Sequence, residues 1–365
     1  MAQVVKNITS IQYFLDYFGL VDNSYNIQMN YHPNAPEKEW SSLPTFVAEF
    51  HNCSVNTLPV LITENRHMIT EHVWPMLDKY KHKGKKNHGL WNAWGNDIEI
   101  EMPPITQQFH GTYKYVWLPI DEESVNNPWH IWIDVISKFR LIEKRWSTNF
   151  AKYVYILSNK SAYFEKVHKE LFPELKYHVM PKGETWRFQH LIVPSMSNHQ
   201  DGVVTPHLPE WLRWFKGSFL MQRDFKPFRK IFVSRAKAKT RKVKNQNELL
   251  MALKGWEPVI LEDMTIKEQV RIFAEATHVL ATHGAGLVNT LWCKPGTKII
   301  ELQDQKMLHK KVYPLLSQAL HLKHELYVTK TVQIQNKGKK PKGVKRLNDL
   351  IDFEVDIPDL IRHLD

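Results

Sequence analysis

The most chemically suggestive residues of this sequence form a short loop, His283-Gly284-Ala285-Gly286, which joins an expected strand to an expected helix. Glycine at such positions lets the backbone approach a bound group closely. The N–H groups and the dipole at the start of a helix also favour an anion. A second expected strand follows a Pro-Gly turn and carries Glu301 near its end. We therefore predict that the loop binds a phosphate, that His283 contacts the phosphate or the leaving group, and that Glu301 accepts a ribose hydroxyl.

Each of these residues also has a purely structural explanation. His283 would serve as a packing or helix-capping residue, Glu301 as a surface carboxylate, and the glycines as parts of a tight turn. Asn289, in the first turn of the expected helix, suits a local hydrogen bond as well as a ligand contact. We favour ligand roles for His283 and Glu301 because the carboxyl ends of parallel strands face the crevice in which ligands bind.

A basic cluster at residues 230–244 is the second feature that suggests chemistry. It begins in the expected strand KIFVS, and Arg235 directly follows this strand. Lys239 and Arg241 come next, in a short irregular segment. Cations at the end of a strand in a parallel sheet point toward the ligand crevice. We expect Arg235, Lys239 and Arg241 to contact a phosphorylated ligand.

The formal net charge of +11 also raises the possibility of a nucleic-acid partner. Such a protein is expected to interleave basic and aromatic residues along one surface. Two further basic runs, at 79–86 and 337–346, are interrupted by glycine or proline and are typical of solvated loops. The sequence therefore does not favour a nucleic-acid partner.

A possible catalytic pair lies in the first half of the chain. His130 and Asp134 are four residues apart, which places them on one face of a helix. Either side chain has the chemistry of a general base that takes a proton from a hydroxyl group. We expect Asp134 to be the base and His130 to be its neighbour or an acceptor contact. Two alternatives remain open: Asp134 only orients His130, or both residues serve packing.

Length and composition bound the class of protein. The 365 residues suit two domains of roughly 150–200 residues each. A hydrophobic content of 43% and a charged content of 24% are typical of a folded soluble protein. The two cysteines have no spacing suited to a metal or a disulfide framework, and no stretch approaches the roughly 20 apolar residues of a membrane span. These features predict a cytoplasmic protein without a transmembrane segment.

Hydrophobic patterning predicts an α/β fold with two similar halves. In the first half, expected strands and helices alternate as βαβαβ and form a Rossmann-like unit. The second half repeats this order, and Thr265 and Glu268 form a capping box at one of its helices. We expect the two halves to face each other across a cleft that binds ligands. The first-half elements are expected at 115–120, 127–145, 152–158, 162–171, 176–180 and 187–195. Those of the second half are expected at 230–234, 247–253, 258–262, 266–276, 277–281, 287–292 and 298–302.

These elements divide the chain into three parts. We expect residues 1–205 to form a Rossmann-like domain with an irregular N-terminal extension. We expect residues 206–345 to form a second Rossmann-like domain, and Pro206 and Pro209 mark the boundary. Residues 346–365 contain a terminal helix with Asp356 as its N-cap.

The sequence resembles glycosyltransferase family 61, which includes plant xylan arabinosyl- and xylosyltransferases and the EGF-domain O-GlcNAc transferase. The resemblance rests on the strand end VSR, the HGAG loop and the strand PGTKIIEL, in this order and at similar spacing. In the first half, NNPWHIWIDVISKF and RFQHLIVPS are similar to family motifs, although Trp129 stands where the family usually has tyrosine. The resemblance covers about residues 115–305.

Membership of this family implies an inverting glycosyltransferase of the two-Rossmann, GT-B-like type. Its donor would be a nucleotide sugar, most often a UDP-sugar, bound by the domain at 206–345. Its acceptor would be a glycan or glycoconjugate, on the side of the domain at 1–205. The terminal helix would possibly cross back to the first domain. No two aspartates of the chain are two residues apart, so the Asp-x-Asp metal motif is absent. We therefore expect no metal and no other cofactor, with cations and a helix end stabilising the leaving diphosphate. The alternative is a catalytically inactive sugar-binding or nucleotide-binding protein of the same fold.

Overall fold

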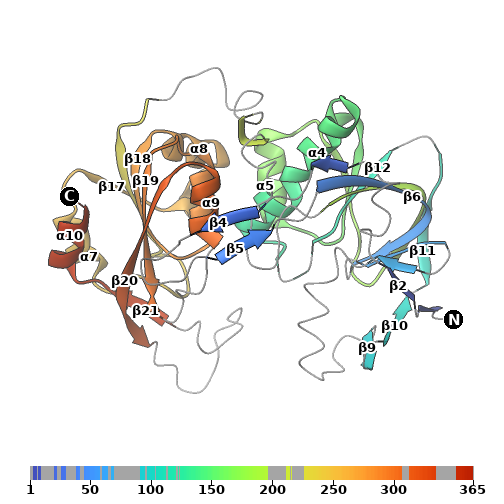
Figure 1. The fold of residues 1–365 in the computed structure, drawn as a ribbon, viewed down its shortest axis with the longest axis horizontal. Helices are drawn as coiled ribbons and strands as arrows, with labels where there is room; N and C mark the ends of the chain where they lie inside the picture. The colour runs from blue at the N-terminus through green and yellow to red at the C-terminus, as the bar shows by residue number, and fades with distance from the viewer. Residues whose placement is uncertain are drawn as a thin grey trace. The chain divides into compact units, whose positions relative to one another are not determined.

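The structure is a computed structural model of the whole chain, and parts of it are described in full. Main chain and side chains are described for residues 47–57, 60–64, 104–111, 114–120, 122, 124–195, 211–213, 215, 226–305, 312–330, 332 and 351–364. Short strands outside these ranges are described by their main chain alone. The chain divides into two compact units (Figure 1). The first comprises Met1–Ile27, Ser41–Gln200 and Val204–Trp211, and the second Gln28–Trp40, Asp201–Val203 and Leu212–Asp365.

The first unit is built on a mixed sheet with a parallel centre. Its strand order is β14-β13-β12-β15-β6-β7-β8-β2. Within this order β14, β13, β12 and β15 run parallel to one another. The long strand β6 runs antiparallel to β15 and extends the sheet on one side. The strands are β2 (Asn7–Thr9), β6 (Thr45–Asn56), β7 (Leu61–Ile62), β8 (His67–Ile69), β12 (Tyr115–Leu118), β13 (Val154–Leu157), β14 (Lys176–Val179) and β15 (Thr185–Pro194).

Smaller pieces complete this part of the chain. Strand β11 (Ile105–Phe109) pairs with β15, and β3 (Leu20–Asp22) pairs with β6. Two small sheets are separate from the main one. They consist of β1 (Gln3–Val5), β10 (Asp97–Met102) and β9 (Trp91–Trp94), and of β4 (Asn26–Met29) and β5 (Lys38–Ser41).

The expected helix at 127–145 is present, but its middle has a different geometry. The segment consists of α3 (Pro128–His130), the π-helix η2 (Ile131–Ile136) and α4 (Ser137–Trp146). Its start follows from the sequence, because the Asn127 side chain accepts a bond from the Trp129 N–H and Pro128 occupies the first turn. Helix α5 (Ala162–Leu171) agrees with its expected bounds and begins at Ser161, whose hydroxyl accepts the Phe164 N–H. The short 3-10 helix η3 (Phe150–Lys152) leads into β13.

The second unit contains a six-stranded sheet in the order β17-β16-β18-β19-β20-β21. The first five strands are parallel, and β21 runs antiparallel at the edge. Helices α7 and α10 lie on one side of this sheet, and α8 and α9 on the other (Figure 1). The strands are β16 (Arg229–Val233), β17 (Trp256–Val259), β18 (Ala276–Thr282), β19 (Lys298–Asp304), β20 (Lys323–Gln333) and β21 (Ile351–Glu354). The helices are α7 (Gln246–Ala252), α8 (Ile266–Ala274), α9 (Val312–Ala319) and α10 (Ile357–Leu364).

Two expected elements of this unit differ in the structure. The strand expected at 258–262 is β17, which ends at Val259 and is followed by the 3-10 helix η4 (Leu261–Asp263). Because β17 is an edge strand, it tolerates Pro258, which cannot donate a ladder hydrogen bond. The helix expected at 287–292 is the 3-10 helix η5 (Ala285–Trp292) and not an α-helix. By contrast, the capping box of Thr265 and Glu268 is present in full.

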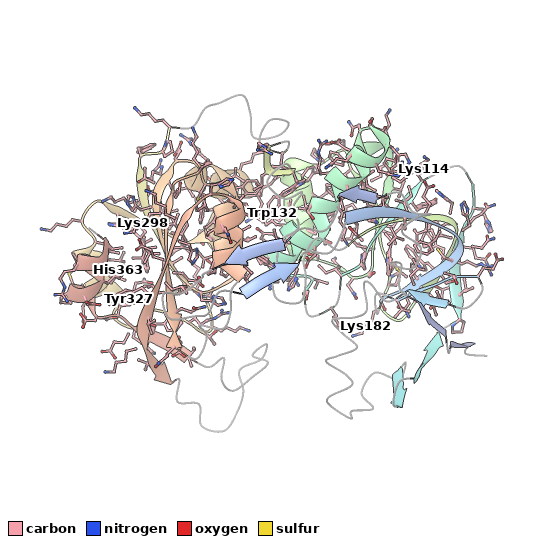
Figure 2. The ribbon with its side chains drawn as sticks, in the orientation of Figure 1. Lys114, Trp132, Lys182, Lys298, Tyr327 and His363 are labelled. Carbon is pink, nitrogen blue, oxygen red and sulfur yellow. The ribbon has the colours of Figure 1, made fainter. Side chains whose placement is uncertain are left out.

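The terminal helix α10 packs in the second unit. Its buried Leu360 and Leu364 share one apolar cluster with Leu249 and Leu253 of the α7 region. Tyr327 of β20 donates a hydrogen bond of 2.9 Å to Asp359, and its ring lies 5.6 Å from that of His363, centroid to centroid (Figure 2). The apolar face of α10 thus matches the one that α7 presents. That the helix also crosses back to the first domain stays a prediction.

Candidate functional site

The HGAG loop and the basic segment meet at the carboxyl ends of β16 and β18 in the second unit. The guanidinium of Arg235 lies directly over Gly284: a Cβ atom on this glycine would be 2.5 Å from Arg235 Nη1. Gly284 has an extended main chain, so the close approach of Arg235, and not backbone strain, requires glycine here. The sequence correctly placed Arg235 beside the glycine loop.

Arg241 is the second cation of this site. Its Nη1 donates a hydrogen bond of 2.9 Å to the carbonyl oxygen of His283. Its φ of 60° lies in the left-handed region, which is costly for a residue with a side chain. Strand β21 holds this conformation, because the Arg241 N–H donates to Ile351 O at 2.6 Å and the Lys242 N–H donates to Asp352 at 2.9 Å.

The charge of Arg241 affects the pKa of Arg235. Burial lowers the pKa of Arg235 to about 10, and the nearby charge of Arg241 acts in the same direction. Two like charges in a partly buried site raise the free energy of the ligand-free protein. An anion placed against both guanidinium groups would relieve this repulsion.

His283 and Glu301 form a buried pair on neighbouring strands. His283 Nδ1 makes a short contact with one oxygen of Glu301, and His324 Nε2 lies 2.9 Å from the other. Burial opposes ionisation of Glu301, but the two imidazoles outweigh it and lower its pKa to about 2. Because Glu301 is fully buried and both of its oxygens meet histidines, this geometry favours orientation of His283 over a contact with ribose.

Two further buried polar atoms belong to the same edge of the sheet. Within the part of the chain that the structure describes, neither Thr282 Oγ1 nor Gln303 Oε1 has a hydrogen-bond partner. Thr282 is the last residue of β18, and Gln303 is the penultimate residue of β19. Buried polar atoms are normally satisfied, so these two are candidates for contact with a ligand or an ordered water.

The remaining sequence-predicted residues of this region have different surroundings. Asn289 is buried, and its amide donates to Gly286 O at 3.1 Å and accepts from Trp292 Nε1 at 3.2 Å. Both ends of the amide are thus used within the protein, which favours the local hydrogen bond. Lys239 is exposed, while Ala285 and Gly286, within the HGAG loop, are half-buried. A Cβ on Gly286 would lie 2.9 Å from Leu261 Cδ1, so this glycine serves close packing.

In the first unit, His130 and Asp134 are in direct contact. His130 Nδ1 lies 2.6 Å from Asp134 Oδ2. The π-helix η2 carries Asp134, and such segments often occur at functional sites. Asp134 Oδ1 is buried and finds no hydrogen-bond partner among the described residues. The pair predicted from the sequence therefore exists, with the imidazole ring held by the carboxylate.

A buried lysine next to this pair has no counterpart in the sequence-based expectations. Lys138 lies four residues beyond Asp134 and is almost fully buried in α4. Burial lowers its pKa to about 8, although the charge of Asp134 acts in the opposite direction. The spacing of His130, Asp134 and Lys138, each four residues apart, was a signal for a column of ionisable groups on one helix face.

Tryptophan rings can stack on sugar faces, but Trp129 and Trp132 are parts of the core. Trp129 is 5% exposed, and Trp132 is fully buried and donates to Tyr163 Oη at 3.2 Å (Figure 2). Neither ring therefore presents a face to a sugar. Trp91 and Trp94 lie on β9, and their side chains are outside the described ones.

Comparison with protein families identifies the class of the protein. The two units both have α/β architecture, and the second places basic residues and a glycine loop at the carboxyl edge of a parallel sheet. The family model Glycosyltransferase 61 matches residues 50–300, more than half of the chain. The chain thus belongs to glycosyltransferase family 61. No curated protein matches the sequence.

No helix in the described part of the chain is both long enough and apolar enough to cross a bilayer.

Proposed function

We propose that the chain is an inverting, metal-independent glycosyltransferase that transfers a sugar from a UDP-sugar to a hydroxyl group of a glycan or glycoconjugate. Membership of glycosyltransferase family 61 supports the general activity. The observation that carries the finer proposal is the pair Arg235 and Arg241, which are crowded together at the HGAG loop. We further propose that the two units are Rossmann-like domains of a GT-B-like enzyme, which face each other across a cleft.

In this proposal the second unit binds the donor through its diphosphate. Arg235 and Arg241 neutralise the phosphate oxygens, and Lys239 adds a third cation at the rim of the site. Gly284, Ala285 and Gly286 supply a backbone that the diphosphate can approach. Charge builds up on the diphosphate as the glycosidic bond breaks, so fixed cations stabilise the transition state more than the ground state.

His283 contributes to the same step. Glu301 accepts from Nδ1 of the ring and thereby fixes its orientation. The imidazolium form of the ring, which the ionised Glu301 stabilises, then donates a hydrogen bond from Nε2 to the phosphate or the leaving group. We assign Glu301 to orienting His283, in place of the ribose contact expected from the sequence.

The pair in the first unit completes the reaction. The acceptor oxygen attacks the anomeric carbon, the bond from this carbon to the diphosphate breaks, and the diphosphate leaves with the bonding electrons. The proton of the acceptor hydroxyl passes to the His130–Asp134 pair, in which the contact at 2.6 Å stabilises an imidazolium once it forms. A single displacement of this kind inverts the configuration at the anomeric carbon.

The proposal is tested first by donor binding. A thermal-shift panel with UDP-, GDP-, CMP- and dTDP-sugars should show stabilisation by a UDP-sugar, both with EDTA and with manganese. Loss of binding in EDTA and its recovery with manganese would refute metal independence. The best donor is then incubated with glycan acceptors, and NMR of the product should show an inverted anomeric configuration. Binding without transfer or hydrolysis would instead identify a catalytically inactive nucleotide-sugar-binding protein.

A further inference from the structure

The proposed function gives no role to His324, the second histidine that contacts the buried carboxylate of Glu301. His324 lies on β20, the strand next to the one that carries Glu301. Its Nε2 is 2.9 Å from Glu301 Oε2, and its Nδ1 is 2.8 Å from the hydroxyl oxygen of Ser317 on α9. A chain of four side chains thus runs from α9 through β20 and β19 to His283 at the HGAG loop.

The carboxylate fixes the direction of the two bonds at Glu301. An ionised carboxylate only accepts, so His283 Nδ1–H and His324 Nε2–H both donate to Glu301. Ser317 meets the other nitrogen of His324, Nδ1, and its hydroxyl group can donate to the neutral ring or accept from the protonated one. In either arrangement both ring nitrogens of His324 are satisfied. Glu301 has one oxygen held by His324 and presents the other to His283.

We propose that His324 and Ser317 are positioning residues, which hold Glu301 ionised and aimed at His283 and so tune the binding of a nucleoside diphosphate at the HGAG loop. This inference rests on the proposed function for its ligand, and on the described contacts for its geometry. It assigns to α9 a direct influence on a site at the opposite end of the hydrogen-bonded chain.

The charges around Glu301 indicate what removing His324 should do. The titratable groups near this carboxylate are His283 from β18, His324 from β20 and Tyr313 from α9. Tyr313 is buried, and its ring lies 5.2 Å from that of His283. Burial alone would raise the pKa of Glu301, and the two histidines reverse this effect. Without His324, the pKa of Glu301 should rise, and a protonated Glu301 would no longer hold His283 as a donor.

The test measures UDP and inorganic pyrophosphate affinity by calorimetry from pH 4.5 to pH 8. In His324→Leu, affinity should fall at the acidic end by roughly tenfold, the lower end of the usual effect of a partner that orients a functional histidine. The unaltered protein should show no such fall, because its Glu301, with a pKa of about 2, stays ionised over this pH range. His324→Gln retains an N–H at the position of Nε2 and should restore the original profile. A pH profile of His324→Leu that matches the unaltered protein would overturn the proposal.

Two further measurements separate the possible failures. Ser317→Ala removes only the hydroxyl group that orients His324, so it should shift the profile in the same direction by less, even where His324→Leu fails to fold. As a matched control, His278→Gln alters a half-buried histidine near the amino end of β18, whereas the HGAG loop follows the carboxyl end, and its profile should be unchanged. A general loss of stability would move the melting temperature of these variants without producing the fall in affinity at acidic pH.

The ligand-free protein provides an independent readout. Nitrogen NMR of the histidine rings should show that His283 titrates differently in His324→Leu and normally in His324→Gln. No binding of UDP or pyrophosphate by the unaltered protein would refute the proposed donor site. An NMR titration of His283 that His324→Leu leaves unchanged would refute the positioning network itself.

Discussion

Each unit contains a histidine whose Nδ1 meets a carboxylate, and the two pairs differ in almost everything else. The His130 and Asp134 side chains are 32% and 14% exposed, whereas those of His283 and Glu301 are 8% and 0% exposed. The first pair joins the last residue of α3 to the π-helix η2, and the second joins the end of β18 to the neighbouring strand β19. Under the proposed function, the same pair of residue types would serve proton exchange with a ligand in the first unit and orientation in the second.

The number of partners supports this distinction. Glu301 has an imidazole at each oxygen, whereas Asp134 Oδ1 has no hydrogen-bond partner among the residues that the structure describes. A carboxylate with both oxygens held is a rigid acceptor, and its pKa stays low. A carboxylate with one oxygen unused has capacity for a further proton or hydrogen bond. Four experiments can break or sharpen this comparison.

The largest effect should come from the pair in the first unit. Asp134→Asn should reduce sugar transfer by about 10²–10⁴-fold, the usual contribution of a positioned base or its partner. Donor affinity should stay the same, because the proposed donor site lies in the second unit. His130→Ala is the companion variant: a smaller loss would show that the imidazole only assists. Transfer at nearly normal rates in both variants would remove this helix from the chemistry.

The second prediction concerns the free energy of unfolding, which should depend more on the buried pair His283–Glu301 than on the pair in the first unit. Glu301→Gln leaves two imidazoles against a neutral amide, and loss of one member of a buried ionic network typically costs about 3–5 kcal/mol. We expect urea denaturation to show a loss in this range. The more exposed Asp134→Asn serves as the control and should cost less than half as much. Equal losses of unfolding free energy in Glu301→Gln and Asp134→Asn would mean that the buried carboxylate contributes no more to stability than the more exposed one.

The third prediction concerns the buried cation next to Asp134. Burial lowers the pKa of Lys138 from the usual 10.5 of a lysine to about 8, so between these pH values the unfolded state binds more protons than the folded state. Stability should therefore rise with pH across this window, by roughly 3 kcal/mol in total. Lys138→Met removes the titration, and its urea midpoint should depend less on pH between 8 and 9.5. A parallel pH dependence in both proteins would show that Lys138 is solvated.

The smallest effect is expected in the donor site. Arg235→Ala should weaken UDP affinity about tenfold or more, because a charge-assisted contact contributes about 1.5–3 kcal/mol. Lys237→Ala is the matched control, since Lys237 pairs with Asp263 on the exposed surface. Calorimetry with UDP measures both. Equal affinities of the Arg235 variant and the control would place Arg235 outside the site.

The sequence was most informative where local patterns decide the structure. The strands that flank the HGAG loop, β18 and β19, lie within two residues of their expected bounds, and the capping box of Thr265 forms as expected. The alternation of strands and helices in both units follows from hydrophobic periodicity and turn residues. It also placed Arg235 and His283 at strand ends, where parallel strands bring them together.

The parts that sequence reasoning missed depend on contacts between distant segments. His324 reaches Glu301 because β20 pairs with β19, and this strand was not among the expected elements. Lys138 resembles a surface residue in sequence, because lysine is rarely buried, and only the packing of α4 conceals it. The π-helix likewise arises from a local shift in hydrogen bonding, and single-sequence periodicity does not reveal it.

The π-helix makes the geometry of the His130–Asp134 pair depend on the length of the chain. Within it, the Ser137 N–H donates to Trp132 O, five residues back, and the Ser137 hydroxyl donates to the Ile133 carbonyl. This turn of the helix therefore contains one residue more than a turn of an α-helix. Deleting a single residue of η2 other than Asp134 would restore the tighter winding and turn everything before it by about 100° relative to α4. His130 would then face a new direction although both residues of the pair are retained.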